Sequence, residues 1–205
     1  MARRDRHDDL RRRAAVRSPR PRFLIVCEGT QTEPEYFLET RIRERSVIDL
    51  QVSPGGVPKT LVERAVAMKR EAALEAKRKK DENLKYDQVW CVFDIDEHPF
   101  VPEAKQQARD NGIEVAISNP CFELWALLHF RDQRAHIERG ALHHECKQYM
   151  PGYEKRLPVS EIYHLLEDAL RRATDLDQWQ NSRGCDGANP STGVYKIMQR
   201  IKELG

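Results

Sequence analysis

Four short hydrophobic runs mark the first two thirds of the chain. They are FLIVC at residues 23–27, IDLQVS at 48–53, QVWCVF at 88–93 and IEVAIS at 113–118. Each run has the length of a strand. The first run is apolar at every position, which is typical of a strand in a parallel sheet that is covered by helices on both faces.

Helical patterns separate these runs. A capping-box pattern and hydrophobic residues three or four positions apart predict helices over residues 33–45, 58–83 and 101–111, and a further helix that starts at Asn119-Pro120. The alternation of strands and helices predicts an α/β fold with a mainly parallel, four-stranded sheet and helices on both faces.

The pattern changes after residue 130, where we expect no further strand. Hydrophobic stripes within residues 162–170 and 194–201 indicate helices. We therefore divide the chain into an arm at 1–22, an α/β domain at 23–130 and a helical C-terminal elaboration at 131–205 that packs on the same domain.

The charge of the chain is unevenly distributed. Its formal net charge is +2, but residues 1–22 contain nine arginines and three aspartates, which is a net charge of +6. The rest of the chain has 26 basic and 30 acidic residues, a net charge of −4. An arm of this composition is too polar to fold alone, so it is either a solvated, disordered tail or a segment attracted to nucleic-acid phosphates.

Composition narrows the class of protein further. No hydrophobic stretch approaches the length of a membrane span, and no apolar core follows the basic N-terminus as it would in a secretory signal. The five cysteines are odd in number and widely spaced, which favours reduced thiols. Together these features predict a cytoplasmic protein.

Acidic residues follow three of the predicted strands. Glu28 comes directly after the first strand, Asp94 and Asp96 follow the third, and Glu123 lies shortly after the fourth. Because ligands bind beyond the carboxyl ends of the strands in open parallel sheets, we expect these four carboxylates to meet at one edge. Carboxylates at i and i+2 of an extended segment face the same side and suit Mg²⁺ or Mn²⁺. Each acid also has a simpler interpretation, as a turn former or, for Glu123, as a member of a buried salt bridge.

Other polar groups give weaker signals. Glu33 and Glu35 lie in the first turn of a helix, where acids complement the helix dipole, although either could join a metal site. His143, His144 and Cys146 lie close together but lack the standard spacing of zinc ligands, so the sequence does not predict a zinc site.

Four segments resemble the RloB family, which is associated with bacterial restriction and phage-defence loci and is similar to the Toprim fold. These segments are FLIVCEGTQTEPEYF, VFDIDEH, ISNPCFELWALLHF and NPSTGVY, and they occur in the family's order over residues 23–200. The resemblance implies a site at Glu28, Asp94 and Asp96 and Mg²⁺-dependent making or breaking of phosphodiester bonds. The chain departs from the Toprim pattern after Glu28, where Thr32 occupies the position expected of an acid and Glu33 follows it.

The leading hypothesis is a Mg²⁺-dependent (or Mn²⁺-dependent) nuclease or phosphodiesterase acting on DNA or RNA in bacterial defence. In this hypothesis Glu28, Asp94 and Asp96 are catalytic and bind the metal, and Glu123 is an auxiliary ligand. One alternative is a module that binds a nucleotide or nucleic acid without cleaving it. Another is a protein that docks on other products of a defence operon through its helical C-terminal region.

Overall fold

A computed structural model describes residues 20–53, 57–95, 100–154 and 156–204. Five strands and eight α-helices are assigned in this part of the chain, with two short 3-10 helices. In chain order the elements are β1 (Arg22–Cys27), α1 (Thr32–Arg43), β2 (Val47–Val52), α2 (Pro58–Lys79), η1 (Glu82–Leu84), β3 (Gln88–Asp94), α3 (Val101–Asp110), β4 (Glu114–Asn119), α4 (Glu123–Leu128), α5 (Arg139–Tyr149), α6 (Val159–Ile162), η2 (Tyr163–Leu165), α7 (Leu166–Ser182), β5 (Ser191–Thr192) and α8 (Val194–Leu204).

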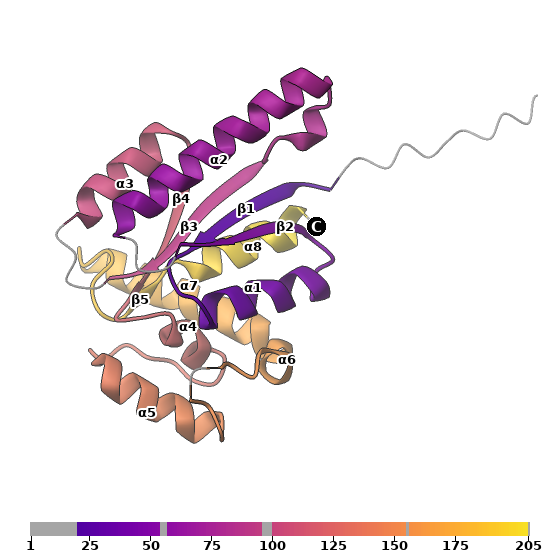
Figure 1. The fold of residues 1–205 in the computed structure, drawn as a ribbon. Coiled ribbons are helices and arrows are strands. Elements are labelled where there is room, and N and C mark those ends of the chain that lie inside the picture. Colours follow the sequence, from indigo (N-terminus) through magenta and orange to yellow (C-terminus); the bar gives the residue numbers. More distant parts are fainter. Residues whose placement is uncertain (1–19, 54–56, 96–99, 155, 205) are drawn as a thin grey trace, which may run out of the picture.

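The sheet confirms the predicted α/β class and corrects the number of strands. Its order is β2-β1-β3-β4-β5, and the pairs among the first four strands are all parallel (Figure 1). The fifth strand was not predicted, because Ser191 and Thr192 form no hydrophobic run. It pairs antiparallel with the end of β4, with Ser118 opposite Thr192 and Asn119 opposite Ser191.

Helices cover both faces of the sheet, as the apolar strands predicted. Alternate residues of β1 divide between two cores: Phe23, Ile25 and Cys27 point to one, and Leu24 and Val26 to the other. The smaller core lies against α2 and α3, and the larger core lies against α1, α4, α7 and α8 (Figure 1). Both faces of the central strands are therefore buried from solvent.

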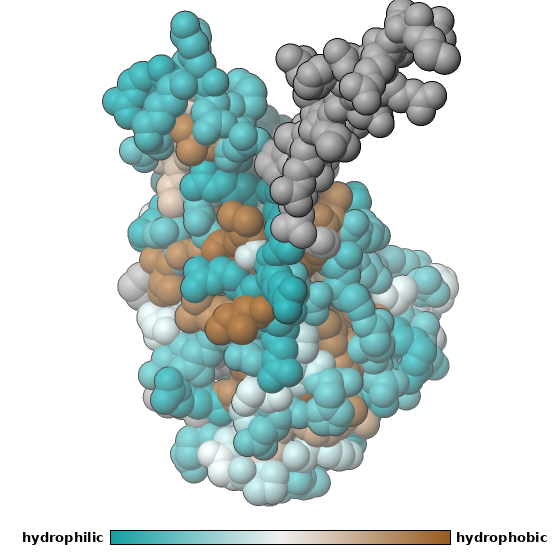
Figure 2. Space-filling view, turned by 90° about the vertical axis from the view of Figure 1, so that its right-hand side faces the viewer, coloured by the Kyte–Doolittle hydropathy of each residue, from teal (hydrophilic) through white to brown (hydrophobic). Residues whose placement is uncertain are grey.

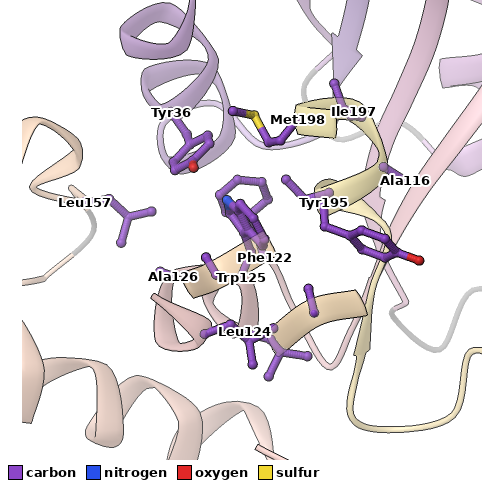
Figure 3. Close-up of a cluster of buried hydrophobic side chains, with 14 of the residues drawn as sticks. Tyr36, Ala116, Phe122, Leu124, Trp125, Ala126, Leu157, Tyr195, Ile197 and Met198 are labelled. Atoms are coloured by element: carbon purple, nitrogen blue, oxygen red, sulfur yellow. The ribbon is translucent and has the colours of Figure 1, made fainter. Parts of the chain in front are cut away.

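The helix α4 lies at the centre of the larger core. Its residues Glu123–Leu128 are all buried, and Figure 3 shows the rings of Phe122 and Trp125 between Tyr36 of α1 and the side chains of α8. Tyr36 contacts both rings edge-on, with centroid distances of 5.8 Å to Phe122 and 6.0 Å to Trp125. This packing holds the start of α4 in place against the carboxyl end of the sheet.

The C-terminal region packs on the same core through β5 and α8. The turn between them passes close to β4: a Cβ atom at Gly193 would lie 2.9 Å from Ala116 Cα, and the Gly193 N–H donates to Ile117 O at 2.9 Å. The hydroxyls of Ser118 and Thr192 are also 3.0 Å apart and buried. A residue without a side chain is thus required at Gly193 for the two backbones to approach.

The edge of the sheet at β2 is partly apolar at the surface. Leu38 and Ile42 of α1 and Val47 of β2 are among the exposed large hydrophobic residues. Figure 2, viewed from the side of α1 and β2, shows hydrophobic residues among hydrophilic ones on this face. None of the described helices has the length and hydrophobicity needed to cross a membrane.

The first described residues lie at the amino end of the parallel strands, opposite the edge where ligands are expected (Figure 1). Strand β1 begins at Arg22, one residue earlier than predicted. The guanidinium of Arg22 is 2.6 Å from Asp49 Oδ2, and its backbone N–H donates to Asp87 at 2.7 Å. Residues 1–19 of the arm lie outside the described residues.

Candidate metal and phosphate site

The strand register brings two of the predicted acids to neighbouring strand ends. Cys27 of β1 pairs with Val92 of β3, and the backbone N–H of Glu28 donates to Val92 O at 3.0 Å. Glu28 therefore follows β1 directly beside the end of β3, where Asp94 is the last residue. Asp94 in turn pairs with Ser118 of β4, so it lies at the centre of the sheet's carboxyl edge.

A pocket of about 300 Å³ opens at this edge. Its walls come from the turn after β1, the end of β3, the start of α4, and α5 with the loop that follows it. The lining residues are Gly29, Thr30, Gln31, Thr32, Glu33, Asp94, Phe122, Glu123, Arg139, His143, Tyr153 and Glu154. Two predicted site residues, Asp94 and Glu123, thus line one pocket. Glu28 directly precedes Gly29, the first residue of the chain that lines it.

Glu33 also lines this pocket, although the sequence pattern favoured a helix-dipole role for it. Glu33 is only 6% exposed, and its side chain folds back over the turn, so that a Cβ atom at Gly29 would lie 2.0 Å from Glu33 Oε2. Burial raises the pKa of Glu33 above its ordinary value, and the negative charges of Glu123 and Glu28 raise it further. Two neighbouring carboxylates therefore repel that of Glu33: Glu123 within the pocket and Glu28 beside it.

Arg139 supplies a positive charge to the same pocket. It is the first residue of α5, and its Nη2 atom lies 3.2 Å from Asp94 Oδ2 and 3.3 Å from Pro120 O. The Arg139 side chain is 46% exposed, whereas that of Asp94 is 19% exposed. Arg139 thus contacts Asp94 from the solvent side of the pocket.

Glu123 is buried, as predicted, and lies in a network of polar side chains. Tyr153 donates to Glu123 Oε1 at 2.8 Å, and His143 Nε2 lies 3.3 Å from the same oxygen. Burial by itself would raise the pKa of Glu123, but hydrogen bonds from Cys121 and Tyr153 and the nearby His143 hold it below its usual range. The same neighbourhood raises the pKa of the Cys121 thiol, first through burial and then through the charge of Glu123.

The remaining predicted ligand, Asp96, lies outside the described residues. Three residues that the sequence did not select, Arg139, His143 and Tyr153, complete the pocket. Only His143 carried a signal, since it belongs to a local group of histidine and cysteine residues. Its partner Glu123 is distant in sequence, so that group could not be connected to the strand ends.

The fold and the pocket define an α/β protein whose mainly parallel sheet carries an acidic site at its carboxyl edge. The chain belongs to the RloB-like protein family, whose family model matches residues 23–201. The match begins at β1 and ends within α8, so it covers most of the chain and the whole pocket. Comparisons with curated proteins and with solved structures find no match.

Proposed function

We propose that this protein is a divalent-metal-dependent nuclease or phosphodiesterase that acts on nucleic acid in bacterial defence. The observation that carries the proposal is the position of Asp94 and Glu33 in one pocket, with Glu28 beside it at the end of the neighbouring strand. Mutually repelling carboxylates at the carboxyl edge of a parallel sheet favour a hard divalent cation. The sequence pattern at Glu28, Asp94 and Asp96, which resembles that of the Toprim site, supports the same chemistry.

Asp94 and Asp96 would hold Mg²⁺ or Mn²⁺ at this edge. A bound Mg²⁺ would polarise the phosphate and stabilise the leaving oxygen. Glu28 lies next to the strand end that carries Asp94, so it would either complete the metal shell or serve as the general acid or base. Glu33, whose pKa is raised, would retain a proton more readily than an ordinary carboxyl group and so limit the repulsion within the pocket.

Arg139 would contact the substrate phosphate. In the described structure its guanidinium lies on Asp94, and a metal ion bound to that carboxylate would release it toward an incoming phosphate oxygen. The arginine-rich arm would add sequence-independent attraction to the nucleic-acid backbone.

A cleavage assay with the full chain tests the proposal. Labelled single-stranded and double-stranded DNA and RNA are incubated with Mg²⁺ or Mn²⁺, and the expected result is cleavage that EDTA abolishes. Asp94→Asn, Asp96→Asn and Glu28→Gln should each reduce the rate at least about 100-fold. Asp175→Asn, a change of a half-exposed aspartate on α7, serves as the control and should leave the rate unchanged. Cleavage that survives in the Asp94 and Asp96 variants would show the assignment to be wrong.

The ion pair between Arg139 and Asp94 favours a second candidate function. An internal cation that neutralises Asp94 suits a module that binds a nucleotide or nucleic acid without cleaving it. Calorimetry separates the two functions. Binding of nucleic acid that EDTA leaves unchanged, with no turnover in Mg²⁺ or Mn²⁺, supports the module, whereas metal-dependent turnover supports the nuclease.

A further inference from the structure

Three side chains of different chemistry converge beside the acidic pocket. Ligand atoms of Cys121, Glu123 and His143 all lie within 4.8 Å of one another. Glu123 is the first residue of α4, Cys121 lies two residues before it, and His143 comes from α5, which packs against α4. The cluster therefore depends on the docking of two helices rather than on a local motif.

We propose that Cys121, Glu123 and His143 bind a divalent transition-metal ion, with Zn²⁺ as the best-suited ion. Zinc bonds of about 2.0–2.3 Å in tetrahedral geometry place neighbouring ligand atoms about 3.3–3.6 Å apart. The distance of 3.3 Å between His143 Nε2 and Glu123 Oε1 already matches this separation of ligand atoms. The Cys121 sulfur lies within 4.8 Å of both atoms, so it needs to approach by no more than about 1.5 Å to complete the set.

The ligand types select against the hard cations expected at the strand ends. A thiolate and an imidazole favour Zn²⁺ over Mg²⁺, which prefers oxygen ligands throughout. Glu123 was counted among the Mg²⁺ ligands on sequence grounds, but its neighbours in space are a sulfur and a nitrogen donor. We therefore assign Glu123 to this second, softer site.

The surroundings of the cluster suit a metal with an open coordination position. Glu123 and His143 both line the pocket, and His143 is 42% exposed at its side chain, so an ion held by them would be reached from the pocket. Three protein ligands with a free fourth position are characteristic of zinc ions that bind water or substrate. Tyr153 acts as a positioning residue, because its hydroxyl donates to Glu123 Oε1 and its ring meets the His143 ring edge-on at 6.2 Å.

Metal titration of the full, reduced chain tests this site. After EDTA treatment and its removal, Zn²⁺ is added in competition with a chromophoric chelator, and the expected result is one tightly bound ion per chain. Co²⁺ is then used as a spectroscopic probe of the same protein. Thiolate-to-cobalt absorption in the near ultraviolet, displaced by Zn²⁺, is expected. Cobalt binding without that absorption would overturn the proposal, and this readout needs no variant.

Substitutions identify which residues bind the zinc ion. Cys121→Ser and His143→Ala should each weaken Zn²⁺ binding at least about 100-fold, and Tyr153→Phe about tenfold. His144→Ala, a change of an exposed histidine on α5, and Cys185→Ser, a change of an exposed free cysteine, are the controls and should leave Zn²⁺ binding unchanged. Circular dichroism verifies that each variant is folded. Undiminished Zn²⁺ binding in folded Cys121→Ser and His143→Ala protein would also overturn the proposal.

The zinc site does not rest on the proposed nuclease function. Its binding assays contain no nucleic acid, so they succeed or fail independently of cleavage. Zinc binding in a chain that shows no Mg²⁺-dependent cleavage would support the site and contradict the nuclease. The absence of zinc binding in a chain that cleaves nucleic acid would support the nuclease and contradict the zinc site.

Discussion

Arg139 at the start of α5 and Asp94 at the end of β3 form an ion pair, with Nη2 and Oδ2 3.2 Å apart. The two residues are 45 positions apart in the chain. Their contact connects the α/β sheet to the helical region that follows residue 130. It also places a fixed positive charge against the carboxylate that both proposed functions use.

Arg139→Ala should strengthen Mn²⁺ binding at the strand ends while it lowers nuclease turnover. Removal of a partly exposed ion pair frees Asp94 for the cation, and we expect a gain in affinity of up to about fivefold. Turnover should fall because a phosphate contact is lost. Paramagnetic resonance measures free Mn²⁺, and the cleavage assay measures turnover.

Arg171→Ala is the matched control for this prediction. Arg171 also lies 3.2 Å from an aspartate oxygen, that of Asp168, but on the outer surface of α7. It should change neither Mn²⁺ affinity nor turnover. Equal effects of the two arginine variants would contradict a specific role for Arg139.

Gly29→Ala should disturb the pocket without unfolding the protein. The new Cβ would lie 2.0 Å from Glu33 Oε2, so the Glu33 carboxylate must move, but it is the end of a flexible side chain. We expect weaker Mn²⁺ binding and lower turnover, with a change in the free energy of unfolding within about 1 kcal/mol. Gly140→Ala is the control, because a Cβ there would meet nothing within 4 Å. A Gly29 variant with unaltered Mn²⁺ affinity and turnover would show that the position of Glu33 is unimportant.

His129 should make the protein less stable as the pH falls from about 6.5 to 4. Burial lowers the pKa of His129 to about 4 in the folded protein, against an ordinary value of 6.5. Between these values the unfolded chain binds a proton that the folded chain does not, so unfolding is favoured at the lower pH. Above pH 6.5 His129 is neutral in both states and contributes no pH dependence. Between pH 6.5 and pH 4, protonation of His129 in the unfolded chain lowers the free energy of unfolding by about 3 kcal/mol in total.

Urea unfolding at pH 7.5 and pH 5 measures this dependence. His129→Gln should reduce the difference in unfolding free energy between the two pH values by about 2 kcal/mol. His144→Gln, a change of an exposed histidine, should leave the difference intact. The idea fails if the wild type and the His129 variant lose the same stability on acidification.

Gly193→Ala should destabilise the fold. Its Cβ would lie 2.9 Å from Ala116 Cα and 3.1 Å from Ile117 N, and backbone atoms of a central strand cannot rotate away. The β4–β5 pairing must therefore open, at a cost of about 1–3 kcal/mol. Chemical denaturation measures the cost, again with Gly140→Ala as the control. Unchanged stability would mean that the turn between β5 and α8 relocates freely.

The arginine-rich arm should control the salt dependence of nucleic-acid binding. Replacement of Arg11, Arg12 and Arg13 by alanine should weaken binding at low salt and reduce the slope of log affinity against log salt by up to about 2–3. Fluorescence anisotropy over a range of KCl concentrations measures the slope. A slope that stays constant would exclude contacts between these arginines and phosphates.

The order of strands and helices up to residue 130 was predictable, because each element has a local hydrophobic period. The apolar run at 23–27 predicted a strand buried on both faces, and β1 is such a strand. Strand β5 was not predicted, because it has no such local period. Ser191 and Thr192 have no pattern of their own, and they form a strand only because Gly193 permits close approach to β4.

The candidate site, too, could be predicted only where it depends on local sequence. The positions of Glu28 and Asp94 at adjacent strand ends, and the burial of Glu123, follow from local sequence and from the geometry of parallel sheets. The residues that contact these acids could not be predicted in this way. Arg139, His143 and Tyr153 reach the pocket from a helical region whose docking depends on packing around α4.

By itself, the sequence determined the α/β class, the basic arm and the edge of the sheet at which acidic residues gather, since these depend on residues close together in the chain. Only the tertiary structure decided the chemistry that surrounds the acids. It placed a guanidinium on Asp94, folded Glu33 over Gly29, and brought a thiol and an imidazole to Glu123. The physical reason is that side-chain packing around α4, and not local periodicity, sets which distant groups come within bonding distance.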